Sequence, residues 1–151
     1  MEDLGRERIH GRPIRLFQLA EWAWEEPGEE RFTLLVAASA FVNDAPLIRR
    51  FAADAVAAGC GWVCAWGEGC EHVHDLFDEA SIAADRFVMS TWDPKGSLAD
   101  ALYFALVDSV PEDVSAGESA VVLAVEEPWL AEVRRLVADQ DELARLWVAE
   151  E

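Results

Sequence analysis

The sequence predicts an α/β domain of three layers, in which helices cover both faces of a mainly parallel sheet. Three observations lead to this prediction. Four apolar segments alternate along the chain with segments of helical periodicity, and the links between them are short. Such alternation is typical of right-handed strand–helix–strand units. In addition, 151 residues of which 52% are hydrophobic suffice for one domain with a full core.

The first strand is expected at 32–39, FTLLVAAS, a nearly continuous apolar run that is typical of a strand covered on both faces. A helix follows, because Asn43 or Asp44 can cap its start and Gly59 suits the position after its end.

Three further strands are expected at 60–66, 86–92 and 119–126, each an apolar run. A helix at 70–80 follows the second strand, and Ser97 begins the next helix with the spacing of a capping box. One long amphipathic helix completes the chain after the last strand.

We expect a domain over residues 32–151, with residues 1–31 as an N-terminal extension packed on it that contributes a possible edge strand. The expected strand order is 2-1-3-4, which is flavodoxin-like or Rossmann-like. In such sheets ligands bind beyond the carboxyl ends of the strands where the order reverses. That rule places the site between the loops 39–44 and 91–97, with 66–70 as their neighbour.

The charge limits the partners. Thirty acidic residues against twelve basic ones give a formal net charge of −18, which opposes direct binding of nucleic acid or anionic lipid and suits a basic protein partner. No apolar run reaches the ~20 residues that cross a bilayer. The charged start predicts no signal peptide, and an odd number of cysteines predicts reduced thiols and a cytoplasmic location.

Cys70, His74 and Asp78 form the candidate catalytic set. A thiol at a helix N-terminus favours the thiolate, and residues four apart on a helix are neighbours, so the three follow the order nucleophile, base and orienting acid. The alternative is that Cys70 packs as a small apolar residue and that the other two lie on a solvated helix face.

No metal site or cofactor is expected. Cys60 and Cys64 on one strand would lie ~13 Å apart, too far to share an ion. No phosphate-binding glycine motif occurs, and a carboxylate in the loop WGEGC would repel phosphate, although the helix start at DPKGS could hold one anion. The candidate ligand-binding residues lie in the loops at the carboxyl ends of the strands: Asn43, Asp44, Trp66, Glu68, Thr91, Trp92, Asp93, Lys95 and Ser97.

Two segments, AWGEGCEHVHDLFDEA at 65–80 and RFVMSTWDPKGSLADALYFA at 86–105, resemble motifs of a family of small bacterial proteins of unknown function. The family-like pattern combines Ala-Trp-Gly-x-x-Cys with Phe-Val-Met-[Ser/Thr]-Thr-Trp. The sequence departs from it at His74, where an acid is expected, and at Asp93, where a histidine is expected. The resemblance implies a location for the site and no activity.

These observations predict a small acidic cytosolic protein that is not an enzyme and binds a basic protein, as an immunity-type inhibitor, an antitoxin or an accessory subunit does. The alternative is a small-molecule-binding protein or thiol enzyme that uses the loops around Cys70 and 91–97. A purely structural subunit is the third possibility.

Overall fold

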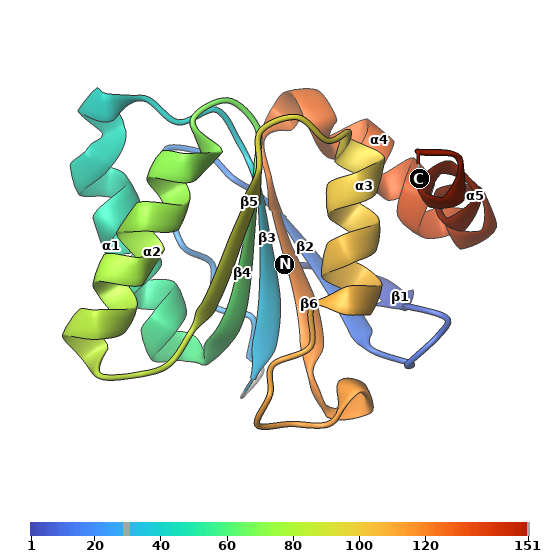
Figure 1. Ribbon diagram of the computed structural model, residues 1–151, viewed down its shortest axis with the longest axis horizontal. Coiled ribbons are helices and arrows are strands. Elements are labelled where there is room, and N and C mark those ends of the chain that lie inside the picture. Colours follow the sequence, from blue (N-terminus) through green and yellow to red (C-terminus); the bar gives the residue numbers. More distant parts are fainter. Residues whose placement is uncertain (29–30, 151) are drawn as a thin grey trace.

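The computed structural model describes residues 1–28 and 31–150. Within these residues a six-stranded, mostly parallel sheet lies between two helical layers, with α1 and α2 on one face and α3, α4 and α5 on the other (Figure 1). The predicted three-layer α/β fold is therefore confirmed.

The strand order is β1-β2-β6-β3-β4-β5, and only β1 runs antiparallel to its neighbour. The sheet holds all four predicted strands and two from the N-terminal segment. The strands are β1 (Glu2–Arg6), β2 (Pro13–Gln18), β3 (Phe32–Ala37), β4 (Cys60–Trp66), β5 (Met89–Asp93) and β6 (Ala120–Val125).

The helices follow the predicted pattern except at the C-terminus. The structure has α1 (Ala45–Ala58), α2 (Cys70–Ala84), α3 (Leu98–Tyr103), α4 (Glu127–Ala138) and α5 (Gln140–Glu150), with 3₁₀ turns at Val42–Asp44 and Ala116–Glu118 and a π-helical turn at Phe104–Asp108. The single helix expected at the end is in fact α4 and α5. The break lies at Asp139, whose carboxylate accepts the backbone N–H of Glu142 and so begins a new helix.

The predicted order 2-1-3-4 is wrong. The fourth of the predicted strands, β6, lies beside the first, β3, so the observed order of these four is 4-1-2-3. The reason is the side on which the helices pack. Right-handed crossovers through α1 and α2 on one face carry the chain outward from β3 to β5, and a crossover through α3 on the other face brings it back past β3.

The N-terminal segment belongs to the sheet. β2 pairs with β6 from Ile14↔Val121 to Gln18↔Val125 and is therefore an inner strand, not the edge strand expected of the segment IRLFQLAEW at 14–22. The exposed strand β1 forms the edge. Its polar, glycine-containing sequence carries no apolar alternation, so the sequence did not predict it.

Arg12 precedes β2 and lies with its guanidinium fully buried beneath α3. Nη1 donates to the carbonyl oxygens of Ala105 and Leu106 in the π-helical turn, at 3.2 and 3.1 Å. Nε donates to the carbonyl of Ser119 at 3.1 Å, and Nη2 donates to Oγ1 of Thr33 at 2.7 Å. The guanidinium thus donates hydrogen bonds to carbonyl groups at a helix end, which have no partners within the helix.

A hydrophobic core lies on each face of the sheet. On the α1–α2 face, Phe51 contacts Trp22 and Trp24 edge-on at ring-centroid distances of 5.5 and 5.4 Å. Two of the seven tryptophans, Trp22 and Trp24, therefore pack on this core. In the described part of the chain, no helix combines the length and the apolar character that crossing a membrane requires.

Candidate functional site

The observed strand order moves the reversal point to β3 and β6, at the upper edge of the sheet in Figure 1. In open α/β sheets this is the place where ligands bind. A groove of about 560 Å³ lies there, and we call it the switch-point groove. It is lined by Glu21, Trp22, Ala23, Ser39, Phe41, Asp44, Leu47, Arg50 and Glu126.

Backbone contacts between loops hold one wall of this groove. The N–H groups of Ala38 and Ala40 donate to the carbonyls of Trp66 and Glu68, at 3.1 and 2.8 Å. The approach is so close that a Cβ on Gly67 would lie 2.1 Å from the carbonyl oxygen of Ala38, and the φ of this glycine is +114°. Only glycine fits at this position, so the loop WGEGC fixes the loop that follows β3.

Glu126 determines the electrostatics of the groove. Its backbone N–H donates to the carbonyl of Ala37 at 3.0 Å, and its carboxylate accepts the N–H of Ser39 at 2.8 Å. In nucleotide-binding relatives of this fold class, loop N–H groups and helix N-termini at the switch point hold phosphate. Here the carboxylate of Glu126 accepts one such N–H group. Glu21 and Asp44 also line the groove, and among the described lining residues Arg50 is the one that is basic, so the charge balance of the groove is negative and disfavours anions.

The outer rim of the groove is apolar. Phe41 and Leu47 line it and are 55% and 39% exposed, and Val42 between them in sequence is 83% exposed. Such side chains are normally exposed singly, and a group of them beside charged residues is typical of an interaction surface.

The candidate catalytic set is only partly assembled. His74 lies 3.5 Å from the carboxylate of Asp78 and packs its ring against Trp92 at a centroid distance of 4.2 Å. Cys70, however, is 2% exposed in the core, and burial raises the pKa of its thiol. A nucleophilic cysteine needs a lowered pKa, so this environment favours packing over catalysis.

The candidate ligand-binding residues do not share one pocket. Asp44 lines the switch-point groove, with Asn43 exposed beside it in the 3₁₀ turn, whereas Trp66 and Glu68 line a neighbouring hollow with Ser39 and Trp129. Lys95 donates its backbone N–H to Asp93. Ser97 begins α3 by accepting the N–H of Asp100 at 3.0 Å, so its role in the structure is that of a helix cap.

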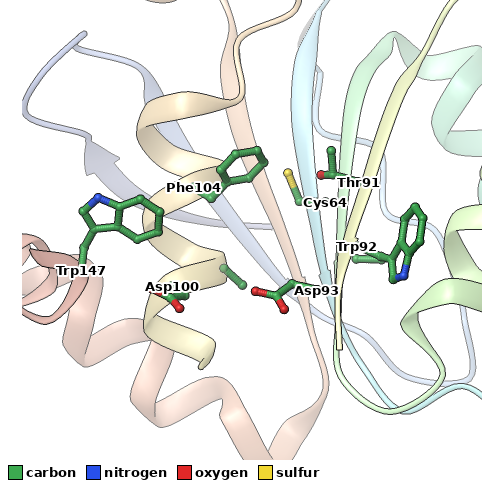
Figure 2. Close-up of a pocket in the computed structure, with 9 residues that line it drawn as sticks. Cys64, Thr91, Trp92, Asp93, Asp100, Phe104 and Trp147 are labelled. Carbon is green, nitrogen blue, oxygen red and sulfur yellow. The ribbon is translucent and has the colours of Figure 1, made fainter. Parts of the chain in front are cut away.

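Thr91, Trp92 and Asp93 line a different cavity, which lies on the α3 face beside the edge strand β5 and which we call the edge pocket (Figure 2). Its volume is about 310 Å³. The other lining residues come from β4, α3, the π-helical turn and α5: Cys64, Ala65, Asp100, Ala101, Phe104 and Trp147. The described residues contain no group of three or more His, Cys, Asp or Glu side chains placed to hold a metal ion.

A family model described as a domain of unknown function, DUF7684, matches residues 14–140. The chain belongs to the DUF7684 family. The search of curated proteins and the search of solved structures each find no match. The predicted resemblance to a family of unknown function is thus confirmed, and membership of DUF7684 assigns no activity.

Sequence reasoning missed several residues of this DUF7684 chain that line the two cavities. Glu126 and Phe41 become neighbours only because β6 lies beside β3, and no local pattern encodes that pairing. Trp147 joins the edge pocket because the C-terminal helix is broken at Asp139 and α5 packs against α3. The one signal in the sequence is its tryptophan content, seven residues in 151, because large aromatic side chains with a polar N–H are common in ligand pockets.

Proposed function

We propose that this DUF7684 protein is an acidic, non-enzymatic module that binds a basic and partly apolar segment of a partner protein in the switch-point groove. One observation carries the proposal: the point at which this fold class binds its ligands presents carboxylates beside exposed apolar side chains. The carboxylates belong to Glu21, Asp44 and Glu126, and the apolar side chains to Phe41, Val42 and Leu47.

The sign of the charge selects the partner. Three carboxylates against the one guanidinium of Arg50 give the groove a negative charge balance that attracts cations and repels phosphate, and the net charge of −18 extends this field over the molecule. The same charge opposes self-association through this face, because two copies would bring like charges together. A segment with lysine or arginine therefore fits better than a nucleotide or a second copy.

The apolar rim gives the interaction an anchor. Full burial of a side chain such as phenylalanine or valine contributes about 1.5–3 kcal/mol, whereas the exposed carboxylates chiefly speed encounter and select the partner. Binding of a partner needs no activated thiol, and Cys70 is buried, which raises the pKa of its thiol. Three free cysteines support a cytoplasmic location.

The test is an NMR titration of ¹⁵N-labelled protein with a short synthetic peptide that alternates arginine and leucine. We expect saturable shifts of the backbone amides of residues 39–47 and 126–129, and weaker binding as salt rises because surface charge is screened. A peptide with glutamate in place of arginine should leave these amides unmoved.

Variants separate groove binding from general attraction to an acidic surface. Val42→Ser and Phe41→Ser should each weaken peptide binding by roughly fivefold or more, in line with the loss of an apolar anchor. The matched control is Ile82→Ser, which removes an 81% exposed side chain near the end of α2, away from the groove. Equal losses in all three variants, or shifts spread over the whole surface, would contradict the proposal.

A further inference from the structure

The edge pocket lies on the opposite face of the sheet from α1 and its 3₁₀ turn, and its chemistry differs from that of the switch-point groove. Its volume of about 310 Å³ is within the range of small-molecule sites, which begins near ~300 Å³. Its position explains the cavity: β5 is the last strand of the sheet, and α3 packs over β3 and β4, so the α3 face of β5 is left partly uncovered.

The two ends of the pocket have different polarity. Asp93 ends β5 and Asp100 lies in the first turn of α3, so both carboxylates lie at the carboxyl edge of the sheet. Figure 2 shows them at one end of the pocket, with Phe104, Cys64 and Thr91 toward the other and Trp147 at the side. Trp92 contributes its backbone, because its ring points to the other face, against His74.

The walls are held in place by contacts outside the pocket. Phe104 packs edge-on against Trp62 at a centroid distance of 6.1 Å, and the indole N–H of Trp62 donates to Thr91 at 3.4 Å. The ring of Trp147 stacks on Tyr103 at 4.9 Å with an interplanar angle of 13°. Aromatic walls that are already ordered reduce the side-chain entropy that the protein must give up when a ligand binds.

The acidic end is also ordered. Oδ1 of Asp93 accepts the backbone N–H groups of Lys95 and Gly96, at 3.0 and 2.8 Å, and these two bonds fix the direction of the carboxylate. Phe104 opens a π-helical turn, a local irregularity that occurs frequently at functional sites.

We propose that the edge pocket binds a small organic cation, an amine whose charge lies beside Asp93 and Asp100 and whose apolar ring lies between Phe104 and Trp147. An amine donates hydrogen bonds to carboxylates and its positive charge is attracted by aromatic faces. An anion of the same shape would meet two carboxylates, and a bare metal ion would leave the aromatic walls uncovered. The site does not depend on the groove proposed for a protein partner.

The experiment uses three probes that share a benzene ring on a two-carbon chain: 2-phenylethylamine, 2-phenylethanol and phenylacetate. Each is titrated into ¹⁵N-labelled protein. The amine should shift the amides of residues 64–65, 91–93 and 100–104 saturably, the alcohol should bind roughly tenfold more weakly, and the carboxylate should not bind.

Isosteric variants test the assignment with little risk to folding. Asp93→Asn and Asp100→Asn should each weaken binding of the amine by roughly tenfold, since each removes one charged acceptor and retains an oxygen at the same place. The matched control, Asp54→Asn, alters an exposed carboxylate on α1 and should change nothing. Ala101→Leu should block the cavity sterically, with the amide spectrum reporting that the fold persists.

Several results would overturn the proposal. These are the absence of saturable binding by the amine, equal affinity for the amine and the carboxylate, shifts centred on residues 39–47, and an undiminished affinity in both aspartate variants. Binding that survives Ala101→Leu would also exclude the edge pocket as the site.

Discussion

Replacing the buried Arg12 with methionine tests whether hydrogen bonds from the guanidinium, and not merely the volume of the side chain, hold the start of β2 to the π-helical turn that follows α3. Methionine fills similar space but donates no hydrogen bond. The carbonyls of Ala105, Leu106 and Ser119 and the hydroxyl of Thr33 would lose a donor inside the core. Those acceptors belong mainly to the backbone, so they remain after the substitution.

The magnitude follows from the number of bonds and the cost of burying the charge. A hydrogen bond to a charged group contributes roughly 1.5–3 kcal/mol, and a buried acceptor left alone costs about 1–3 kcal/mol. Burial of the charge offsets part of the stability that these hydrogen bonds contribute. The cost shows in the pKa of Arg12, which desolvation of the charged form lowers to about 10. We therefore expect Arg12→Met to reduce the free energy of unfolding by about 2–4 kcal/mol, a large share of the 5–15 kcal/mol typical of a domain.

The assay is urea unfolding at neutral pH, followed by tryptophan fluorescence and circular dichroism. Arg134→Met is the control, since it removes an exposed arginine whose ion pair with Glu2, at 2.9 Å, should contribute no more than about 1 kcal/mol. If Arg12→Met is as stable as the unaltered protein, apolar packing suffices at this position and the hydrogen-bonding argument is refuted.

Three further predictions concern single sites. Burial raises the pKa of the Cys60 thiol to about 12 and of the Cys64 thiol to about 11. The thiols of the unfolded chain lose their protons above ~8.5, so the contribution of the two cysteines to stability should be constant below that pH and fall by about 2 kcal/mol for each thiol, or about 4 kcal/mol together, by pH 10. Urea titrations should find this loss smaller in Cys60→Ala and Cys64→Ala. Gly67→Ala should destabilise strongly and lower the thermal midpoint, because its Cβ would collide with the backbone of Ala38; an unchanged midpoint would mean that the loop relaxes. Ser97→Ala should cost about 1 kcal/mol in chemical unfolding through loss of the cap on α3, whereas Ser97→Asp should not.

The sequence predicted the strands that are buried on both faces, because a continuous apolar run marks each of them. The runs at 32–39, 60–66 and 119–126 are strands within two residues of the expected bounds, because each is apolar on both faces and so must lie inside a covered sheet. The third strand was expected at 86–92 and lies at Met89–Asp93, since an edge strand has a weaker apolar pattern. Strand order depends on the face that each helix covers, and no single segment carries that information.

The candidate site shows the same division. Thr91, Trp92 and Asp93 were predicted to lie in a loop beyond the end of a strand. They lie within β5 itself and line a cavity on the α3 face of the sheet. Cys70 lies at the expected helix start, but its side chain is buried in the core, where desolvation raises the pKa of the thiol by more than the backbone hydrogen bonds lower it. The local sequence predicts the helix or strand to which a residue belongs. How deeply its side chain is buried depends on the helices and strands that pack against that element.

The position of β6 has a consequence for how this chain acquires its structure. β6 is encoded near the end of the chain, yet it lies between β2 and β3 and is the strand that joins the N-terminal hairpin to the rest of the sheet. During synthesis on a ribosome, the hairpin of β1 and β2 and the fragment of β3, β4 and β5 emerge before β6, the strand that joins them into one sheet. Loop closure over such separations is slow, so we expect cooperative, late assembly and no stable intermediate in which β2 is docked before residue 125 has emerged.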